Sequence, residues 1–177
     1  MLLNLRRIRS AHERFDSVYQ PADFGGQAEE GFQVIAPATL GFDVYKDKEH
    51  FRLVGGVQTT LELPCSRCLE PFAWPVDAAF DLRYQPQSTN TGPVDSDERE
   101  IEEDDLTTAF YEGDAIDLGQ LMREQFYLAL PMKPLCTAAC RGLCPICGTN
   151  LNKGDCDCDR RWDDPRFAAL KKLNAES

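Results

Sequence analysis

The sequence predicts an α+β protein: an antiparallel β-sheet domain with one packed helix, followed by a small C-terminal Cys-rich zinc-knuckle module. Apolar residues alternate along several segments before residue 85, as in strands that bury one face. One amphipathic segment, residues 117–130, has helical spacing, and six of the eight cysteines fall within the 23 residues from 136 to 158. We expect a sheet domain over residues 1–132 and the cysteine module over residues 133–177.

Length and composition are compatible with a globular protein that has a real core, at 177 residues and 42% hydrophobic content. No apolar run approaches the roughly 18 residues of a membrane helix. The basic N-terminus has no apolar stretch after it, so no secretory signal is expected. We therefore expect a cytoplasmic protein, in which thiols stay reduced and a cysteine cluster indicates metal binding. A disulfide framework is the alternative.

The net charge of −11 is concentrated in one segment. Residues 95–117 carry 11 acidic residues and one Arg, a net charge of −10, whereas residues 133–177 carry 8 basic and 6 acidic residues. Phosphate-dominated nucleic-acid binding requires clustered Lys and Arg, so a basic protein partner suits the acidic segment better.

The strand predictions follow the alternating segments in order. A basic arm or short strand opens the chain, and alternation then covers residues 34–44, 51–63 and 72–84. Pro75 lies on the opposite phase of the last segment, which favours an edge strand or a bulge. We interpret these segments as an antiparallel sheet with one buried face. Residues 85–105 are polar and then acidic, which predicts a mobile loop.

Two helices are predicted after the loop. Asp117 can cap the first, residues 117–130, and Leu118, Leu121, Met122 and Phe126 form its apolar stripe. The second should begin at Asp163 or Asp164, with Pro165 at its first position.

The cysteines provide the strongest local signal. Cys144-Pro-Ile-Cys147-Gly has the form of a zinc knuckle, in which a tight turn directs two thiolates at one metal. Candidate ligands in the module form three pairs: Cys136 with Cys140, Cys144 with Cys147, and Cys156 with Cys158. Cys65 and Cys68 form a further pair between two strands. This pair is a second metal half-site or two free thiols, since Pro71 argues against the helix that a thioredoxin-like motif requires.

Eight sulfurs would satisfy two sites of four thiolates, or one site with the remaining thiols free. We expect Zn²⁺ rather than an iron–sulfur cluster, because the regular ferredoxin spacings are absent. Four cations in the module are candidate contacts for a partner protein or RNA, and ordinary surface charge is the alternative: Arg141, Lys153, Arg160 and Arg161.

Catalysis has no positive support in the sequence. The two histidines, His12 and His50, lie far from every cysteine pair, and there is no glycine-rich phosphate-binding loop. We expect no catalytic residue and no small-molecule substrate.

Several separated motifs resemble the YceD family, whose members are known as large ribosomal RNA subunit accumulation proteins. The resemblance is carried by Cys65-Ser-Arg-Cys68-Leu-Glu-Pro-Phe72, Leu130-Pro-Met-Lys-Pro-Leu-Cys136, Gly142-Leu-Cys-Pro-Ile-Cys147-Gly, Asn150-Leu-Asn152, Cys156-Asp-Cys158 and Asp164-Pro-Arg166. It covers the chain from about residue 31 to its end. Some family members keep the first Cys-x-x-Cys but lack the C-terminal cysteines.

The resemblance implies a non-catalytic ribosome-biogenesis factor that supports accumulation or processing of the large-subunit (23S) ribosomal RNA. The partner would be a ribosomal protein, an assembly factor or a ribonuclease, with a possible rRNA contact. An alternative from another class is a cytosolic thiol-redox or metal-delivery protein that uses Cys65 and Cys68.

Overall fold

The computed structural model describes residues 1–25, 31–86, 108–111 and 113–159. The predicted C-terminal helix, and the predicted acidic loop from residue 87 onward, lie outside these residues. The chain divides into two compact units, which we call the sheet unit (Met1–Pro64 and Phe72–Pro134) and the cysteine unit (Cys65–Pro71 and Leu135–Ser177).

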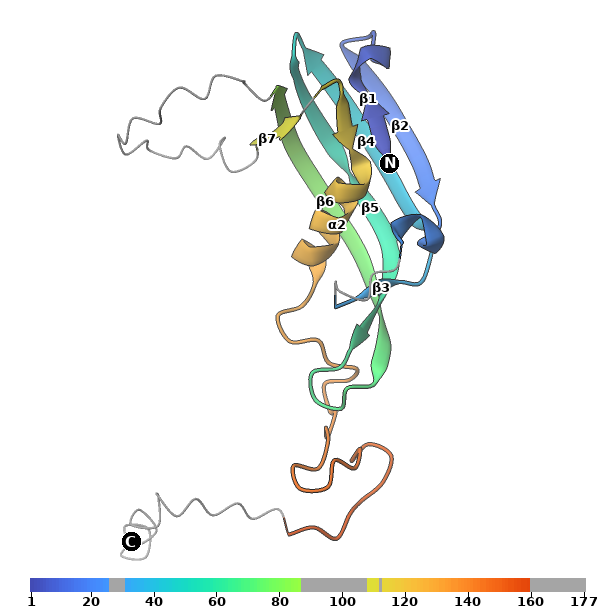
Figure 1. Ribbon diagram of the computed structural model, residues 1–177, viewed down its shortest axis with the longest axis vertical. Coiled ribbons are helices and arrows are strands. Elements are labelled where there is room, and N and C mark those ends of the chain that lie inside the picture. Colours follow the sequence, from blue (N-terminus) through green and yellow to red (C-terminus); the bar gives the residue numbers. More distant parts are fainter. Residues whose placement is uncertain (26–30, 87–107, 112, 160–177) are drawn as a thin grey trace, which may run out of the picture. The chain divides into compact units, whose positions relative to one another are not determined.

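The sheet unit is built on six strands, in the order β2-β4-β5-β6-β7 with β3 also paired to β5 (Figure 1). The strands are β2 (His12–Tyr19), β3 (Gln33–Val34), β4 (Ala38–Asp47), β5 (His50–Pro64), β6 (Pro71–Pro86) and β7 (Thr108–Tyr111). The β2–β4, β4–β5 and β3–β5 pairs are antiparallel. The α+β class is therefore confirmed.

One pair departs from the expected antiparallel sheet. Strand β7 runs parallel to β6, with Arg83 opposite Thr108 and Pro86 opposite Tyr111. The sheet is therefore mixed. Strand β7 pairs with only the last four residues of β6, so among the described residues Pro75 has no strand partner on that side.

The remaining elements are short. Strands β1 (Leu2–Asn4) and β8 (Ala115–Asp117) form a separate antiparallel pair, and the 3₁₀ helices η1 (Leu5–Arg7) and η2 (Pro21–Phe24) connect strands. Helix α2 (Leu118–Ala129) follows β8 directly. Asp117 caps it, because its carboxylate accepts hydrogen bonds from the backbone N–H groups of Gly119 at 2.8 Å and Gln120 at 3.3 Å.

A single hydrophobic core joins α2 to the sheet. The stripe of α2 is buried with the inward residues of β4 and β5, and the ring of Phe126 meets that of Phe24 at a tilt and that of Phe32 edge to face. Members of this core include Leu40, Phe42, Val44, Leu53, Val57, Leu61, Leu118, Leu121 and Met122. Among the described residues none of the cysteine unit belongs to this core, so the sheet unit has a hydrophobic core of its own.

Candidate metal centre

All eight cysteines are described, and they gather into two groups of four inside the cysteine unit. Site I contains Cys65, Cys68, Cys136 and Cys140, and site II contains Cys144, Cys147, Cys156 and Cys158. Within each site the four sulfurs lie within 4.8 Å of one another. Sequence spacing left the grouping open, and the structure brings the Cys65–Cys68 pair together with the first pair of the C-terminal stretch.

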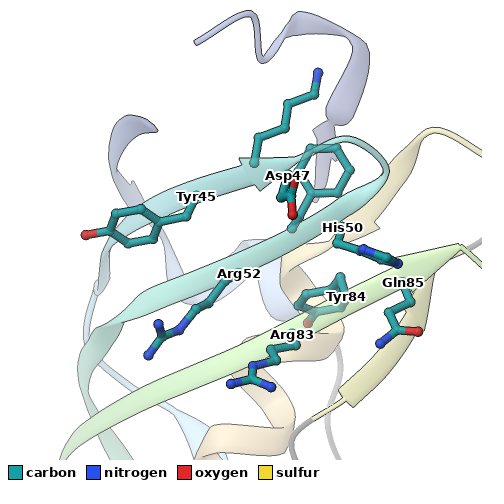
Figure 2. A pocket seen from close by; sticks show the side chains of 9 residues that line it. Tyr45, Asp47, His50, Arg52, Arg83, Tyr84 and Gln85 are labelled. Atoms are coloured by element: carbon teal, nitrogen blue, oxygen red, sulfur yellow. The ribbon is translucent and has the colours of Figure 1, made fainter. Parts of the chain in front are cut away.

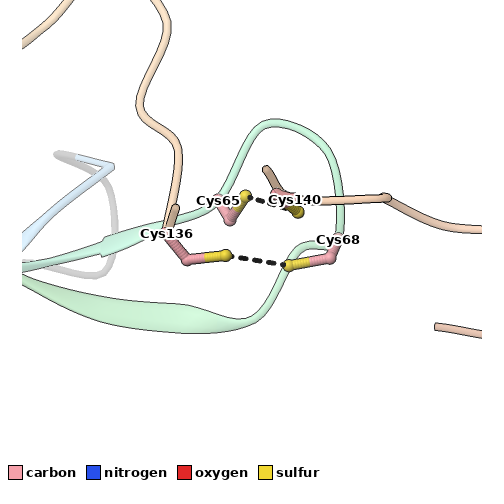
Figure 3. A group of neighbouring side chains, drawn as sticks. All are labelled: Cys65, Cys68, Cys136 and Cys140. Atoms are coloured by element: carbon pink, nitrogen blue, oxygen red, sulfur yellow. Dashed lines mark hydrogen bonds between the residues drawn. The ribbon is translucent and has the colours of Figure 1, made fainter. Parts of the chain in front are cut away.

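Site I is drawn in Figure 3, where the two halves of the site approach from segments far apart in the sequence. The Sγ atoms of Cys65 and Cys140 are 3.8 Å apart, and those of Cys68 and Cys136 are 3.7 Å apart. A disulfide requires a sulfur–sulfur distance of about 2.05 Å. All eight cysteines are free thiols in this structure.

The same backbone turn forms the first half of both sites. In site I the N–H of Leu69 donates to the carbonyl of Cys65 at 2.9 Å, and in site II the N–H of Gly148 donates to the carbonyl of Cys144 at 2.9 Å. Each turn is closed by a second bond, from Cys65 N–H to the Glu70 carbonyl at 2.9 Å and from Cys144 N–H to the Thr149 carbonyl at 2.8 Å. The two Cys-x-x-Cys segments are therefore equivalent knuckles.

The knuckles differ at the residue after the second cysteine. Gly148 has φ +73°, and Leu69 occupies the equivalent position with φ +60°. This left-handed region suits glycine and costs other L-residues roughly 1–2 kcal/mol. Leu69 thus carries backbone strain at a position where the second knuckle has none.

Hydrogen bonds connect the two sites into one unit. The Arg67 carbonyl accepts the Leu143 N–H at 3.1 Å, and the Arg67 guanidinium donates to the Cys140 carbonyl at 2.9 Å. Asn152 donates its side-chain amide to the Cys140 sulfur at 3.3 Å. The Asn152 amide thus orients the Cys140 sulfur of site I, as groups just outside the ligand shell of a metal site do.

The two sites differ in exposure. In site I the side chains of Cys65, Cys68 and Cys140 are buried and Cys136 is partly buried, whereas in site II only Cys144 is buried and Cys147 is exposed. A metal in site I would therefore be better shielded from solvent than one in site II.

Thiol acidity in site I is uneven. Burial alone would raise the pKa of Cys65, but backbone N–H groups, led by that of Cys136, outweigh it and lower the pKa to about 6. At Cys68 the Glu70 backbone N–H acts to lower the pKa, yet burial and the neighbouring sulfurs raise it to about 12. At Cys140 burial acts to raise the pKa, but the Asn152 amide and the Gly142 backbone N–H outweigh it and lower the pKa, whereas burial raises the pKa of Cys136. Two thiolates are therefore favoured in site I, and protons stay on the other two sulfurs.

Site II shows the same contrast. The Thr149 hydroxyl, 3.1 Å from the Cys147 sulfur, helps to lower the pKa of Cys147 to about 6. The hydrogen bond with Cys147, together with burial, raises the pKa of Cys158 to about 12. A divalent cation in each site would favour four thiolates at once, which protons alone do not permit.

Two of the four candidate partner contacts are described. Arg141 forms an ion pair with Asp155 at 2.5 Å, and Lys153 forms one with Glu70 at 2.7 Å. Arg160 and Arg161 lie outside the described residues. Part of the positive charge on Arg141 and Lys153 is thus directed at carboxylates of the cysteine unit itself.

The sheet unit contains a pocket of about 380 Å³ where β4, β5 and β6 meet (Figure 2). Its lining includes His50, Arg52, Arg83 and Tyr84, and no Ser, Thr or Cys is among the lining residues. Arg52 is bound through two nitrogens to Asp81, at 2.7 and 2.5 Å. The pocket is therefore lined by a histidine and by an arginine that is ion-paired with Asp81. No sequence pattern predicted this pocket, because its lining residues come from three separate segments.

The other histidine is also engaged in the sheet unit. His12 lies 2.9 Å from an oxygen of Asp43 and stacks on the ring of Tyr45.

No helix among the described residues is long and apolar enough to cross a membrane.

The comparisons with known proteins agree on one family. The family model described as "Large ribosomal RNA subunit accumulation protein YceD" matches residues 53–174, a range that contains all eight cysteines. No solved structure matches the chain significantly.

Two chloroplastic relatives are named large ribosomal RNA subunit accumulation protein YCED homolog 1. The one from Arabidopsis thaliana is 28% identical over 158 residues, covering 79% of this chain and 49% of the relative. The one from Zea mays is 28% identical over 162 residues, covering 74% and 52%. The chain thus spans about half the length of these relatives. An uncharacterized protein of Mycobacterium tuberculosis is 30% identical over 175 residues, covering 95% of this chain and 76% of the relative.

Proposed function

Since this chain belongs to the YceD family, we propose that it is a non-catalytic ribosome-biogenesis factor that supports accumulation of the large-subunit (23S) ribosomal RNA. The observation that carries the proposal is the extent of the family match. Residues 53–174 include the second half of the sheet and both cysteine sites, so the resemblance does not depend on one short motif.

We propose Zn²⁺ as the ion of both sites. Four thiolates at the corners of a tetrahedron, each about 2.3 Å from a central zinc, lie about 3.8 Å apart. The sulfur separations of 3.8 and 3.7 Å in site I support that arrangement. An iron–sulfur cluster distributes its thiolates over two or more irons, and its sulfurs lie farther apart than those around one ion.

A site closed by four thiolates has no open position for substrate, so its contribution is to folding. Site I would join the turn at Cys65–Cys68 to Cys136 and Cys140, and site II would hold the C-terminal stretch. The proposed role of zinc is therefore to fix the shape of a contact surface.

We propose that the partner is a protein of the large subunit, an assembly factor or a ribonuclease, with direct rRNA contact as the second possibility. The acidity of residues 95–117 supports a basic protein partner. RNA contact through Arg141, Lys153, Arg160 and Arg161 remains a prediction. The cytoplasm is the proposed compartment, because eight free thiols require reducing surroundings.

The thiol-redox or metal-delivery function is the second candidate. Its supporting observation is the lowered pKa of Cys65. Against it, Cys65 and Cys68 are 0% and 4% exposed, which leaves little access for a disulfide substrate. Alkylation of the zinc-loaded protein tests this function: rapid modification of both thiols would favour it.

The main experiment deletes or depletes the gene for this chain in growing cells and measures the ratio of large-subunit to small-subunit rRNA. We expect the ratio to fall and to be restored by the wild-type chain. Metal analysis of the purified protein should give about two zinc ions per chain, one for each set of four thiolates. An unchanged rRNA ratio would contradict the biogenesis function, and a protein without zinc would contradict the metal assignment.

A further inference from the structure

Leu69 combines two unfavourable features. It adopts φ +60°, a conformation shared by only one other non-glycine residue among those described, Lys48 in the β4–β5 turn. Its side chain is also 65% exposed and takes no part in the hydrophobic core. The equivalent residue of the other knuckle is Gly148, which adopts the same backbone without strain.

The knuckle fold gives no reason for a leucine here. The turn is closed by backbone hydrogen bonds that Gly148 makes equally well at 2.9 Å. Packing gives no reason either, because most of the Leu69 side chain faces solvent. Strained, exposed residues of this kind are typical of contact sites, where the strain is offset by binding.

The net charge of the cysteine unit, to which Leu69 belongs, indicates the kind of partner. The described residues of the cysteine unit carry three cations and four carboxylates, a net charge of −1. Four thiolates around one divalent ion have a combined charge of −2. Two such sites therefore bring the net charge of the described part of the unit from −1 to −5. Residues 160–177 contribute +2 by sequence, which leaves −3 for the whole unit. The module that looks basic from Lys and Arg alone is acidic once the metal-bound thiolates are counted, which favours a basic protein over RNA as its partner.

We propose that the first knuckle is a docking point for a basic protein, with Leu69 as the apolar anchor that enters a pocket on that protein. The negative charge of the metal-loaded sites would attract the basic surface of the partner. Burial of the Leu69 side chain in the partner's pocket would supply the affinity. That the partner is basic rests on the proposed zinc ions, and that it is a large-subunit ribosomal protein rests on the proposed biogenesis function; the choice of Leu69 as the anchor rests on its backbone angle and exposure alone.

The test uses the full zinc-loaded chain and two variants. L69G removes the side chain and relieves the strain, whereas L69M keeps an unbranched apolar side chain at the same position. The probes are a panel of individually purified large-subunit ribosomal proteins and, separately, protein-free large-subunit rRNA.

We expect the wild type to bind at least one basic protein of the panel, more weakly as salt is raised. L69G should lose about tenfold or more in affinity, as loss of a buried anchor does, and L69M should stay within about threefold. Zinc content and thermal stability of L69G should not fall. An anchoring role thus predicts lower affinity with an intact fold, which a packing role would not produce.

Four binding or stability results would overturn the inference. They are equal affinity of wild type and L69G, loss of zinc or of the fold in L69G, Leu69-dependent binding to rRNA without any protein ligand, and binding to neither probe. The rRNA ratio in cells separates this inference from the proposed function. If L69G restores the ratio fully, the docking point is wrong while the biogenesis function stands.

Discussion

Gly142 and Gly148 both adopt left-handed backbone conformations, with φ +75° and +73°, but their surroundings differ. A Cβ at Gly142 would lie 3.1 Å from the carbonyl oxygen of Arg67, which also accepts the Leu143 N–H, whereas a Cβ at Gly148 would meet nothing within 4 Å. We expect Gly148→Ala to cost the cysteine unit roughly 1–2 kcal/mol, the penalty of the left-handed region alone. Gly142→Ala should cost more, because it also disturbs the contact between sites I and II.

Chelator competition measures this difference, since weaker folding of the module lowers its apparent zinc affinity. Leu69→Gly serves as the opposite control, because it removes a strained side chain from the same kind of turn. Equal effects of the two alanine variants would show that the Arg67 contact has no energetic weight.

Tyr84 gives the sheet unit a dependence on alkaline pH. Burial, with a smaller contribution from Glu124, raises the pKa of Tyr84 to about 12, from an ordinary value of 10.0. The folded state therefore favours the neutral phenol. The contribution of Tyr84 to the free energy of unfolding is present in full below pH 10 and is lost as the pH rises toward 12. Over this interval the wild type should lose about 2–3 kcal/mol relative to Tyr84→Phe.

Urea unfolding of both proteins at several pH values measures the difference. The comparison isolates Tyr84, because all other titrating groups are common to the two proteins. A constant difference between pH 10 and 12 would mean that Tyr84 ionises equally well in the folded and unfolded chains.

At the scale of elements, helix α2 depends on its cap. Asp117 accepts hydrogen bonds from two backbone N–H groups of the first turn, and the N-terminal amine lies 3.7 Å from its carboxylate. We expect Asp117→Ala to lower the free energy of unfolding by about 1 kcal/mol. Asp117→Asn should retain most of that free energy, since the amide oxygen still accepts hydrogen bonds from the two backbone N–H groups. Thermal unfolding of the three proteins tests the prediction, and an equal loss in both variants would assign the effect to charge rather than to capping.

Two strands show where sequence patterns fail. Strand β2 alternates exposed with partly buried residues and has no fully buried one, and it includes charged residues, so the sequence did not separate it from a basic arm. Strand β7 pairs parallel to β6, and its four residues carry no information on direction. Direction is decided by the path of the intervening chain, which local periodicity does not encode.

At the scale of the molecule, the sheet unit and the cysteine unit should respond differently to loss of metal. In the part of the chain that the structure describes, every residue of the hydrophobic core belongs to the sheet unit. We expect a strong chelator to abolish the ordered structure of the cysteine unit while the sheet unit stays folded, because small metal modules gain their folding energy from the ion.

Amide hydrogen exchange before and after chelation measures the two units separately. Cys147→Ser, which should release only the ion of site II, provides an intermediate state with one zinc per chain. Loss of protection in β4 and β5 after chelation would show that the sheet depends on the metal and would contradict the prediction.

The sequence by itself determined the features that depend on near neighbours. The Cys144–Cys147 turn, the stripe of α2 and the alternation of β4 and β5 are each specified within a few residues, where spacing fixes direction. It also located every cysteine of the two sites, because ligand type is a property of the residue.

Only the tertiary structure decided which cysteines belong together. Cys68 and Cys136 are separated by 68 positions, and their sulfurs meet at 3.7 Å because β5 and β6 carry the first knuckle while the chain after α2 supplies the second pair. The same holds for Leu69, whose strain appears only in its backbone angle and exposure. Pairings across long loops depend on the path of the whole chain. Closing such a loop costs entropy, and the contacts that offset this cost join residues far apart in the sequence, so a local pattern does not reveal them.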